Sequence, residues 1–208
     1  IYCDKEIKDE LIRQIQKQIK KQFGSTPLNN KNYGKIINEK HFSRIHNLID
    51  PNKVVCGGDS NPGTLQIAPT VMDHVTFQDA VMQEEIFGPV LPILTYDSLD
   101  EAIVNINSMA HPLALYIFTS NKEVAEKVTS HCGFGGGCVN DTIIHLATSE
   151  MGFGGFGESG MGSYHGKDGF NTFSHYKSIV DKKTWLDLPM RYQPYRKVYE
   201  KLLRKFLK

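Results

Sequence analysis

Hydrophobic residues recur at helical spacing in the first part of the chain. An apolar residue stands at every fourth position, at Ile7, Leu11, Ile15 and Ile19. This stripe predicts an amphipathic helix that begins after the cap residue Asp4 and ends at Gly24. A second helix with an apolar face is expected over residues 38–49, and Pro51 would stop it.

Between residues 54 and 139 the pattern changes to short apolar runs separated by helical stretches. Ser98 with Glu101, and Ser120 with Glu123, have the spacing of capping boxes and predict two helices between the later runs. Strands that are apolar on both faces and alternate with helices indicate a mostly parallel sheet with flanking helices. The fold class is therefore α/β. Strands are expected over residues 54–56, 65–72, 90–96, 113–118 and 135–139.

The C-terminal region predicts one more strand, over residues 172–180, and a final helix over residues 196–208. In this helix apolar residues fall in pairs four positions apart, and lysines and arginines fill the other side. A basic amphipathic helix can lie on an anionic membrane surface or dock its apolar face on a partner subunit. We favour docking, because a single short basic helix would adsorb to a membrane only weakly and reversibly.

Composition and charge narrow the class of protein. The chain has the apolar and charged content of a soluble globular protein, and its net charge of +1 favours neither nucleic acid nor membrane. We see no apolar run long enough to span a bilayer and no signal peptide. The cysteines form no C-x-x-C pair, and the group His131, Cys132 and Cys138 does not match a zinc spacing. No metal site is expected, and idle thiols in a reducing cytoplasm are favoured.

The stretch QEEIFGPVLPI, residues 83–93, carries the sharpest candidate chemistry. Adjacent side chains on an extended segment point to opposite sides, so only one of Glu84 and Glu85 need face a site. A carboxylate can accept hydrogen bonds from both hydroxyls of a ribose. Phe87 lies on the side of Glu85 if the segment stays extended. On the residues alone, a solvated glutamate pair and a core phenylalanine remain the favoured interpretation.

The stretch GFGGFGESGMGSYHG, residues 152–166, contains a formal G-x-G-x-x-G at Gly152, Gly154 and Gly157. In a dinucleotide-binding fingerprint the glycines follow a strand and open a helix. Here they follow HLATSEM and run into more glycine, so we expect no phosphate site. We expect the glycines instead to allow tight turns and a close approach to neighbouring backbone.

Four motifs resemble, in order, those of the aldehyde dehydrogenase superfamily. They are EEIFGPVLP, HPLALYIFT, GGGCVND and FGGFGESGMGSYHGKDGFNTFSH. The last resembles the class 3 branch, which includes fatty-aldehyde dehydrogenases. The resemblance covers essentially the whole chain. It implies the catalytic-domain fold of that family and the oxidation of aldehydes to carboxylic acids with NAD or NADP through a cysteine thioester.

The start of the chain departs from the family pattern. IYCDKE resembles what immediately follows the segment that holds the family's nucleophilic cysteine. By this resemblance the nucleophile, the general-base glutamate and the dinucleotide-binding domain would all lie upstream of Ile1, and Cys3 comes too late to be the nucleophile. No catalytic residue is therefore assigned within the chain, and the 208 residues alone are expected to be inactive.

The resemblance also implies roles for individual residues. Glu85 would hold the nicotinamide ribose, and Phe87 would pack on it. Phe153, with Ile144 and His145 from the preceding loop, would line the tunnel for an aldehyde that is medium-chain, long-chain or aromatic. On the residues alone, a hydrogen-bonded structural histidine is favoured for His145, as it is for His165.

By the same resemblance the chain divides into three parts. Residues 1–170 would be the catalytic-domain portion, residues 171–182 an oligomerisation strand and residues 183–208 a C-terminal tail with the amphipathic helix. A cytoplasmic homodimer is expected, with at most weak peripheral membrane contact through residues 196–208 and no nucleic-acid partner. The alternative function is a non-catalytic α/β module for subunit assembly.

Overall fold

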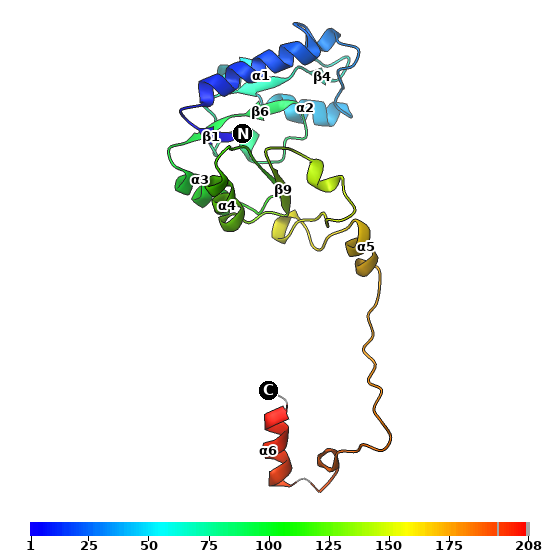
Figure 1. Ribbon diagram of the computed structural model, residues 1–208. Coiled ribbons are helices and arrows are strands. Elements are labelled where there is room, and N and C mark those ends of the chain that lie inside the picture. Colours follow the sequence, from blue (N-terminus) through cyan, green and yellow to red (C-terminus); the bar gives the residue numbers. More distant parts are fainter. Residues whose placement is uncertain (195, 207–208) are drawn as a thin grey trace.

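The computed structural model describes residues 1–194 and 196–206. The helices α1 to α5 lie together with all the strands, whereas an extended segment leads from α5 to α6, which stands apart (Figure 1). The strands are β1 (Tyr2–Asp4), β2 (Val54–Cys56), β3 (Ser60–Asn61), β4 (Gln66–Ile67), β5 (Thr70–Met72), β6 (Val90–Pro92), β7 (Leu94–Tyr96), β8 (Ala114–Ile117) and β9 (Gly136–Val139). The helices are α1 (Lys8–Phe23), α2 (Glu39–Asn47), α3 (Leu99–Asn107), α4 (Lys122–His131), α5 (Gly166–Thr172) and α6 (Lys197–Phe206).

A mixed sheet forms the centre of the first half of the chain. β5 lies between β2, which is antiparallel to it, and β6, which is parallel to it. β7 follows β6 after one residue and pairs in parallel with β1. The amide of Ile93 donates to Met72 while that of Leu94 donates to Ile1. The apolar run at 90–96 therefore has a neighbouring strand on each edge.

Helices cover both faces of this sheet. Val71 and Ile93 pack with Ile12 of α1 on one face. Met72 and Leu94, each the next residue along the chain, belong to the cluster on the other face with Phe42 and Ile45 of α2. Successive side chains of a strand point to opposite faces, so a strand covered on both faces must be apolar throughout. This confirms the interpretation of the continuous apolar runs.

The chain from α3 to β9 folds as a β-α-β unit. β8 and β9 run parallel, with Tyr116 opposite Cys138, and α4 connects them. Side chains of α3, β8 and α4 share one small cluster that includes Ile103, Ile117 and Val128. The parallel arrangement of this unit was predicted from the alternation of strands and helices, and it is confirmed.

Three predicted element boundaries are wrong, each for a local reason. Asp4 does not cap α1, because it pairs in β1 and its carboxylate accepts the amide of Glu6 in a turn, so α1 begins at Lys8. α4 is capped by Asn121, whose side chain accepts the amide of Glu123, and not by the capping box one residue earlier. The run at 65–72 is divided between β4 and β5 by a segment that contains Pro69, which lacks an amide hydrogen to donate. The cap predicted at Ser98 is confirmed.

The segment after the glycine-rich stretch differs from its prediction. Thr172 ends α5, a helix that was not predicted, and residues 174–180 form no strand in the single chain. A strand requires a neighbouring backbone for its hydrogen bonds, and within the described residues this segment has none. α6 confirms the C-terminal helix as far as Phe206, and residues 207–208 lie outside the described part. None of the described helices is both long enough and apolar enough to cross a bilayer.

Candidate functional site

Arg44 of α2 binds the segment at residues 84–86, which lies just before β6. Its guanidinium pairs with the Glu84 carboxylate at 3.0 Å and donates to the carbonyl oxygen of Ile86 at 2.6 Å. It also approaches the carbonyl oxygen of Glu85 at 3.4 Å. Glu84 is thus engaged by α2, whereas the exposed side chain of Glu85 lines a cavity. The two adjacent carboxylates therefore have different surroundings.

Phe87 is not a core residue. Its side chain is 77% exposed, and its backbone has φ +48, in the left-handed region. For a residue other than glycine that conformation costs on the order of 1 kcal/mol and is common at ligand sites. Gly88 then passes against α2, where an added Cβ would lie 2.8 Å from Cδ1 of the fully buried Ile45. The segment is therefore not extended at Phe87, and simple alternation does not determine which side the ring faces.

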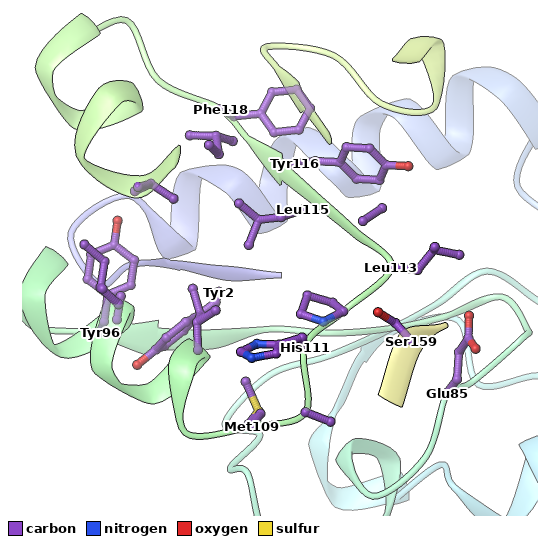
Figure 2. Close-up of a pocket in the computed structure, with 18 of the residues that line it drawn as sticks. Tyr2, Glu85, Tyr96, Met109, His111, Leu113, Leu115, Tyr116, Phe118 and Ser159 are labelled. Atoms are coloured by element: carbon purple, nitrogen blue, oxygen red, sulfur yellow. The ribbon is translucent and has the colours of Figure 1, made fainter. Parts of the chain in front are cut away.

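A cavity of about 1250 Å³ lies alongside β8 (Figure 2). Along β8 its wall includes Leu115 and the residues on either side, and the opposite wall includes Tyr2 and Tyr96. Glu85 and Ser159 lie near the start of the strand. Of the predicted site residues, Glu85 and Phe153 line this cavity. Phe87, Ile144 and His145 are not among the described residues that line it.

The cavity lies between two strands that each have one unpaired edge. Among the residues that the structure describes, β8 pairs only with β9, and β1 pairs only with β7. One hydrogen bond, from Asn105 of α3 to the Tyr2 hydroxyl at 2.9 Å, links the two walls. Backbone donors and acceptors at a strand edge need partners, so the apolar trough between these two edges is a surface on which a further strand could pair.

The predicted substrate residues are only partly brought together. His145 is 8% exposed, and its ring lies 5.6 Å from that of Phe153 and 5.8 Å from that of Tyr116, centroid to centroid. Ile144 lies in the same short 3-10 turn, and its side chain is exposed. The ring of His165 stacks on the ring of Phe153, with the two centroids 6.0 Å apart. Two predicted residues therefore form an aromatic cluster, and Ile144 lies outside it.

Sequence reasoning missed two residues beside this cluster. His111 stacks on Phe156 at 4.6 Å and lines the cavity. Cys138 of β9 places its Sγ 3.5 Å from Nδ1 of His145. Both residues lie in the motifs HPLALYIFT and GGGCVND, but apolar periodicity does not show that either contacts an aromatic ring or an imidazole. Within the described residues no group of three His, Cys, Asp or Glu side chains is arranged to hold a metal ion.

The glycine-rich stretch folds back on itself. Phe153 and Tyr164 exchange two backbone hydrogen bonds, of 2.9 and 3.0 Å, and their bridge is antiparallel. An added Cβ on Gly154 would lie 2.1 Å from the carbonyl oxygen of Gly162, and one on Gly135 would lie 2.5 Å from that of Gly154. The prediction that these glycines permit backbone to pass close to backbone is confirmed.

Comparisons with known proteins give the family of the chain. Residues 1–179 match the aldehyde dehydrogenase family. The 4,4'-diaponeurosporen-aldehyde dehydrogenase of Staphylococcus aureus is 43% identical over all of this chain and 46% of its own length. The dimeric NADP-preferring aldehyde dehydrogenase of Mus musculus is 47% identical over 86% of this chain and 40% of its own length. Family 3 members B3 and B1 are 42% identical.

A solved structure shares the fold over nearly the whole chain. The substrate-bound state of the Staphylococcus aureus AldH superposes with a TM-score of 0.89 at 43% identity, covering 99% of this chain and 45% of that one. An aldehyde dehydrogenase of Mycobacterium tuberculosis complexed with NAD+ gives 0.76 at 27% identity, over 90% of this chain and 40% of that one. The chain spans less than half the length of each of these relatives.

Proposed function

Because the chain belongs to the aldehyde dehydrogenase family, in its class 3 branch, we propose that it supplies one wall of an enzyme that oxidises aldehydes to carboxylic acids with NAD or NADP. The observation that carries this proposal is the separation of two adjacent carboxylates. Arg44 engages Glu84 and leaves Glu85 at the cavity. The same separation positions Glu85 without neutralising it.

The residues present fit a nicotinamide nucleotide. Within the described chain no side chain donates to the Glu85 carboxylate, so it is available to accept from both hydroxyls of the nicotinamide ribose. Phe87, two residues later, offers an exposed ring on which the nucleotide can pack. NAD(P)+, when bound, supplies the electron-pair acceptor for the oxidation. The role of this chain is to orient the nucleotide and exclude water.

On the substrate side we propose an aldehyde tunnel that is lined by Phe153, His145 and Ile144. Phe153 lines the large cavity, and the His145 ring lies 5.6 Å from the ring of Phe153, centroid to centroid. An aromatic surface of this kind suits a medium-chain, long-chain or aromatic aldehyde, because apolar burial contributes roughly 25 cal/mol per Å². The glycine-rich stretch holds Phe153 through its pairing with Tyr164 and binds no phosphate.

In this proposal the reacting thiol and the general-base carboxylate come from the portion of a full-length aldehyde dehydrogenase that these 208 residues do not cover. The apolar trough between β1 and β8 is where that part would pack and complete the sheet. The experiment measures NAD(P)H formation by the 208-residue chain and by a longer protein that joins it to the preceding half of a relative. Activity of the longer protein alone supports the proposal. Aldehyde oxidation by the 208 residues would contradict it.

The second candidate function is subunit assembly, and it is compatible with the first. Residues 174–180 belong to no helix or strand of the single chain, and large exposed side chains, among them Phe173 and Val180, lie in and next to this segment. We propose that residues 171–182 pair with a partner subunit and that the tail at 183–208 docks on the same homodimer. The relative from Mus musculus is named as dimeric. We propose a cytoplasmic protein with at most weak, reversible membrane-surface contact through residues 196–208.

A further inference from the structure

Cys138 and His145 form a close thiol–imidazole pair. Cys138 Sγ lies 3.5 Å from Nδ1 of His145. His145 is 8% exposed, and its Nε2 is buried without a hydrogen-bond partner among the described residues. The ring is held against β9, because Gly136 lies under it: an added Cβ there would be 3.1 Å from Cδ2 of His145. The imidazole is thus packed in one orientation with Nδ1 facing the thiol.

The other cysteines have different surroundings. Burial raises the pKa of the Cys3, Cys56 and Cys132 thiols, which makes their reactive thiolate forms scarcer. In the described structure none of these three sulfurs has a hydrogen bond to a histidine. Cys56 is half-buried, as Cys138 is, but it has no histidine beside it. Cys56 is therefore the reference for labelling at similar exposure, and a variant of His145 isolates the effect of the imidazole.

We propose that Cys138, with His145 as its base, is a capture site for α,β-unsaturated carbonyl compounds. The site goes beyond the proposed oxidation, since it needs neither NAD(P) nor the family's own nucleophile. A thiol activated by a neighbouring base is a strong nucleophile toward a soft electrophilic carbon. The ring of Phe153 beside His145 provides an apolar surface for the carbon chain of such a compound.

The addition needs only the unsaturated compound, Cys138, His145 and a water molecule that carries the proton. The Cys138 proton passes to Nδ1 of His145, and the sulfur lone pair forms a bond to the β-carbon of the ligand. The electron pair of the carbon–carbon double bond moves toward the α-carbon, which then takes up the proton from His145 through water. The product is a saturated thioether that keeps its carbonyl group. No oxidant or reductant is consumed.

The test measures labelling of the native protein by acrolein at a fixed pH without nucleotide, followed by peptide mapping. Cys138 is expected to react at least about tenfold faster than Cys56, in line with general-base catalysis. In H145N, Cys138 is expected to slow about tenfold while Cys56 is unchanged, with circular dichroism checking that the variant is folded. C138S should abolish the fast adduct.

Two results would overturn the proposal. One is equal labelling of Cys138 and Cys56 in the unaltered protein, and this comparison decides the matter by itself if H145N does not fold. The other is a folded H145N whose Cys138 reacts at the unaltered rate, which would show that exposure and not the imidazole sets reactivity. Neither result bears on aldehyde oxidation, because the labelling uses no nucleotide.

Discussion

The two halves of the folded body differ in how completely they are enclosed. The sheet of β2, β5 and β6 has a helix on each face, and Ile45 and Met72 are almost wholly buried there. The β-α-β unit of β8 and β9 instead has a free strand edge beside a large apolar trough. The first region is enclosed by its own helices, whereas the second leaves the apolar side chains around the cavity less covered. The contrast indicates that a substitution in the first region should cost more stability than a matched one in the second.

Truncating the enclosed core should give the largest effect on stability. Ile45→Ala removes a side chain with 0% exposure, and the expected loss of unfolding free energy is roughly 2–5 kcal/mol. Leu115→Ala in the half-buried wall of the trough is the matched variant and should cost less than about 1.5 kcal/mol in the 208-residue chain. Urea denaturation of both variants measures the difference. Equal losses would show that the trough is not an open wall.

Substitution of Glu85, which lines the cavity, should affect turnover more than stability. Glu85→Gln in the longer enzyme is expected to lower kcat on the order of a hundredfold, because the ribose contact positions the nicotinamide ring. Glu84→Gln breaks only the partly exposed pair with Arg44, so kcat should change little and stability by less than about 1 kcal/mol. Steady-state kinetics of both variants provide the measurement. The reverse ranking of the two variants would refute the assignment of Glu85.

Ion pairs in the two regions should differ in strength and in pH dependence. Burial acts to raise the pKa of Asp73, but hydrogen bonds from Lys8 and from the His74 amide outweigh it and hold the pKa below its usual value. This stabilisation is complete above the ordinary aspartate pKa of about 4. It is lost as pH falls through the lower pKa of the folded state. Asp73→Asn should therefore cost about 1–3 kcal/mol at pH 7 and much less near pH 2.

The control for that pH effect lies in the less enclosed unit. Lys127 of α4 pairs with Asp100 of α3 at 2.5 Å, and both side chains are more than a third exposed. Asp100→Asn should therefore cost less than about 0.5 kcal/mol at any pH. Thermal melting of both variants from pH 2 to pH 7 makes the comparison. A loss for Asp73→Asn that does not shrink at low pH would contradict the linkage.

The detached C-terminal helix should contribute least to the stability of a single chain. Deleting residues 196–208 is expected to leave the melting temperature nearly unchanged and to weaken the dimer, as measured by sedimentation at decreasing concentration. Arg204→Gln, which removes only the pair with Glu200 worth roughly 0.3 kcal/mol, is the matched control. If the truncated enzyme stays dimeric and instead no longer sediments with anionic vesicles, the helix binds membranes and not a subunit.

Local patterns in the sequence determined much of the secondary structure and the fold class. Apolar periodicity predicted α1, α2 and the parallel β8–β9 unit, because burial of one stripe or of both faces is required wherever the element packs. The capping box at Ser98 predicted the start of α3, since a cap depends only on residues within one turn. The spacing of glycines predicted close backbone contact in the stretch that contains Gly154.

Only the tertiary structure decided how individual side chains of the candidate site are used. Arg44, forty positions earlier in the sequence, separates Glu84 from Glu85, and the bend at Phe87 exposes a ring that the pattern alone would have buried. The same is true of Cys138, whose proximity to His145 depends on how the loop after β9 folds back. These outcomes depend on contacts between residues that are distant or not regularly spaced in the chain. A local sequence pattern carries no information about such contacts, and packing in three dimensions does.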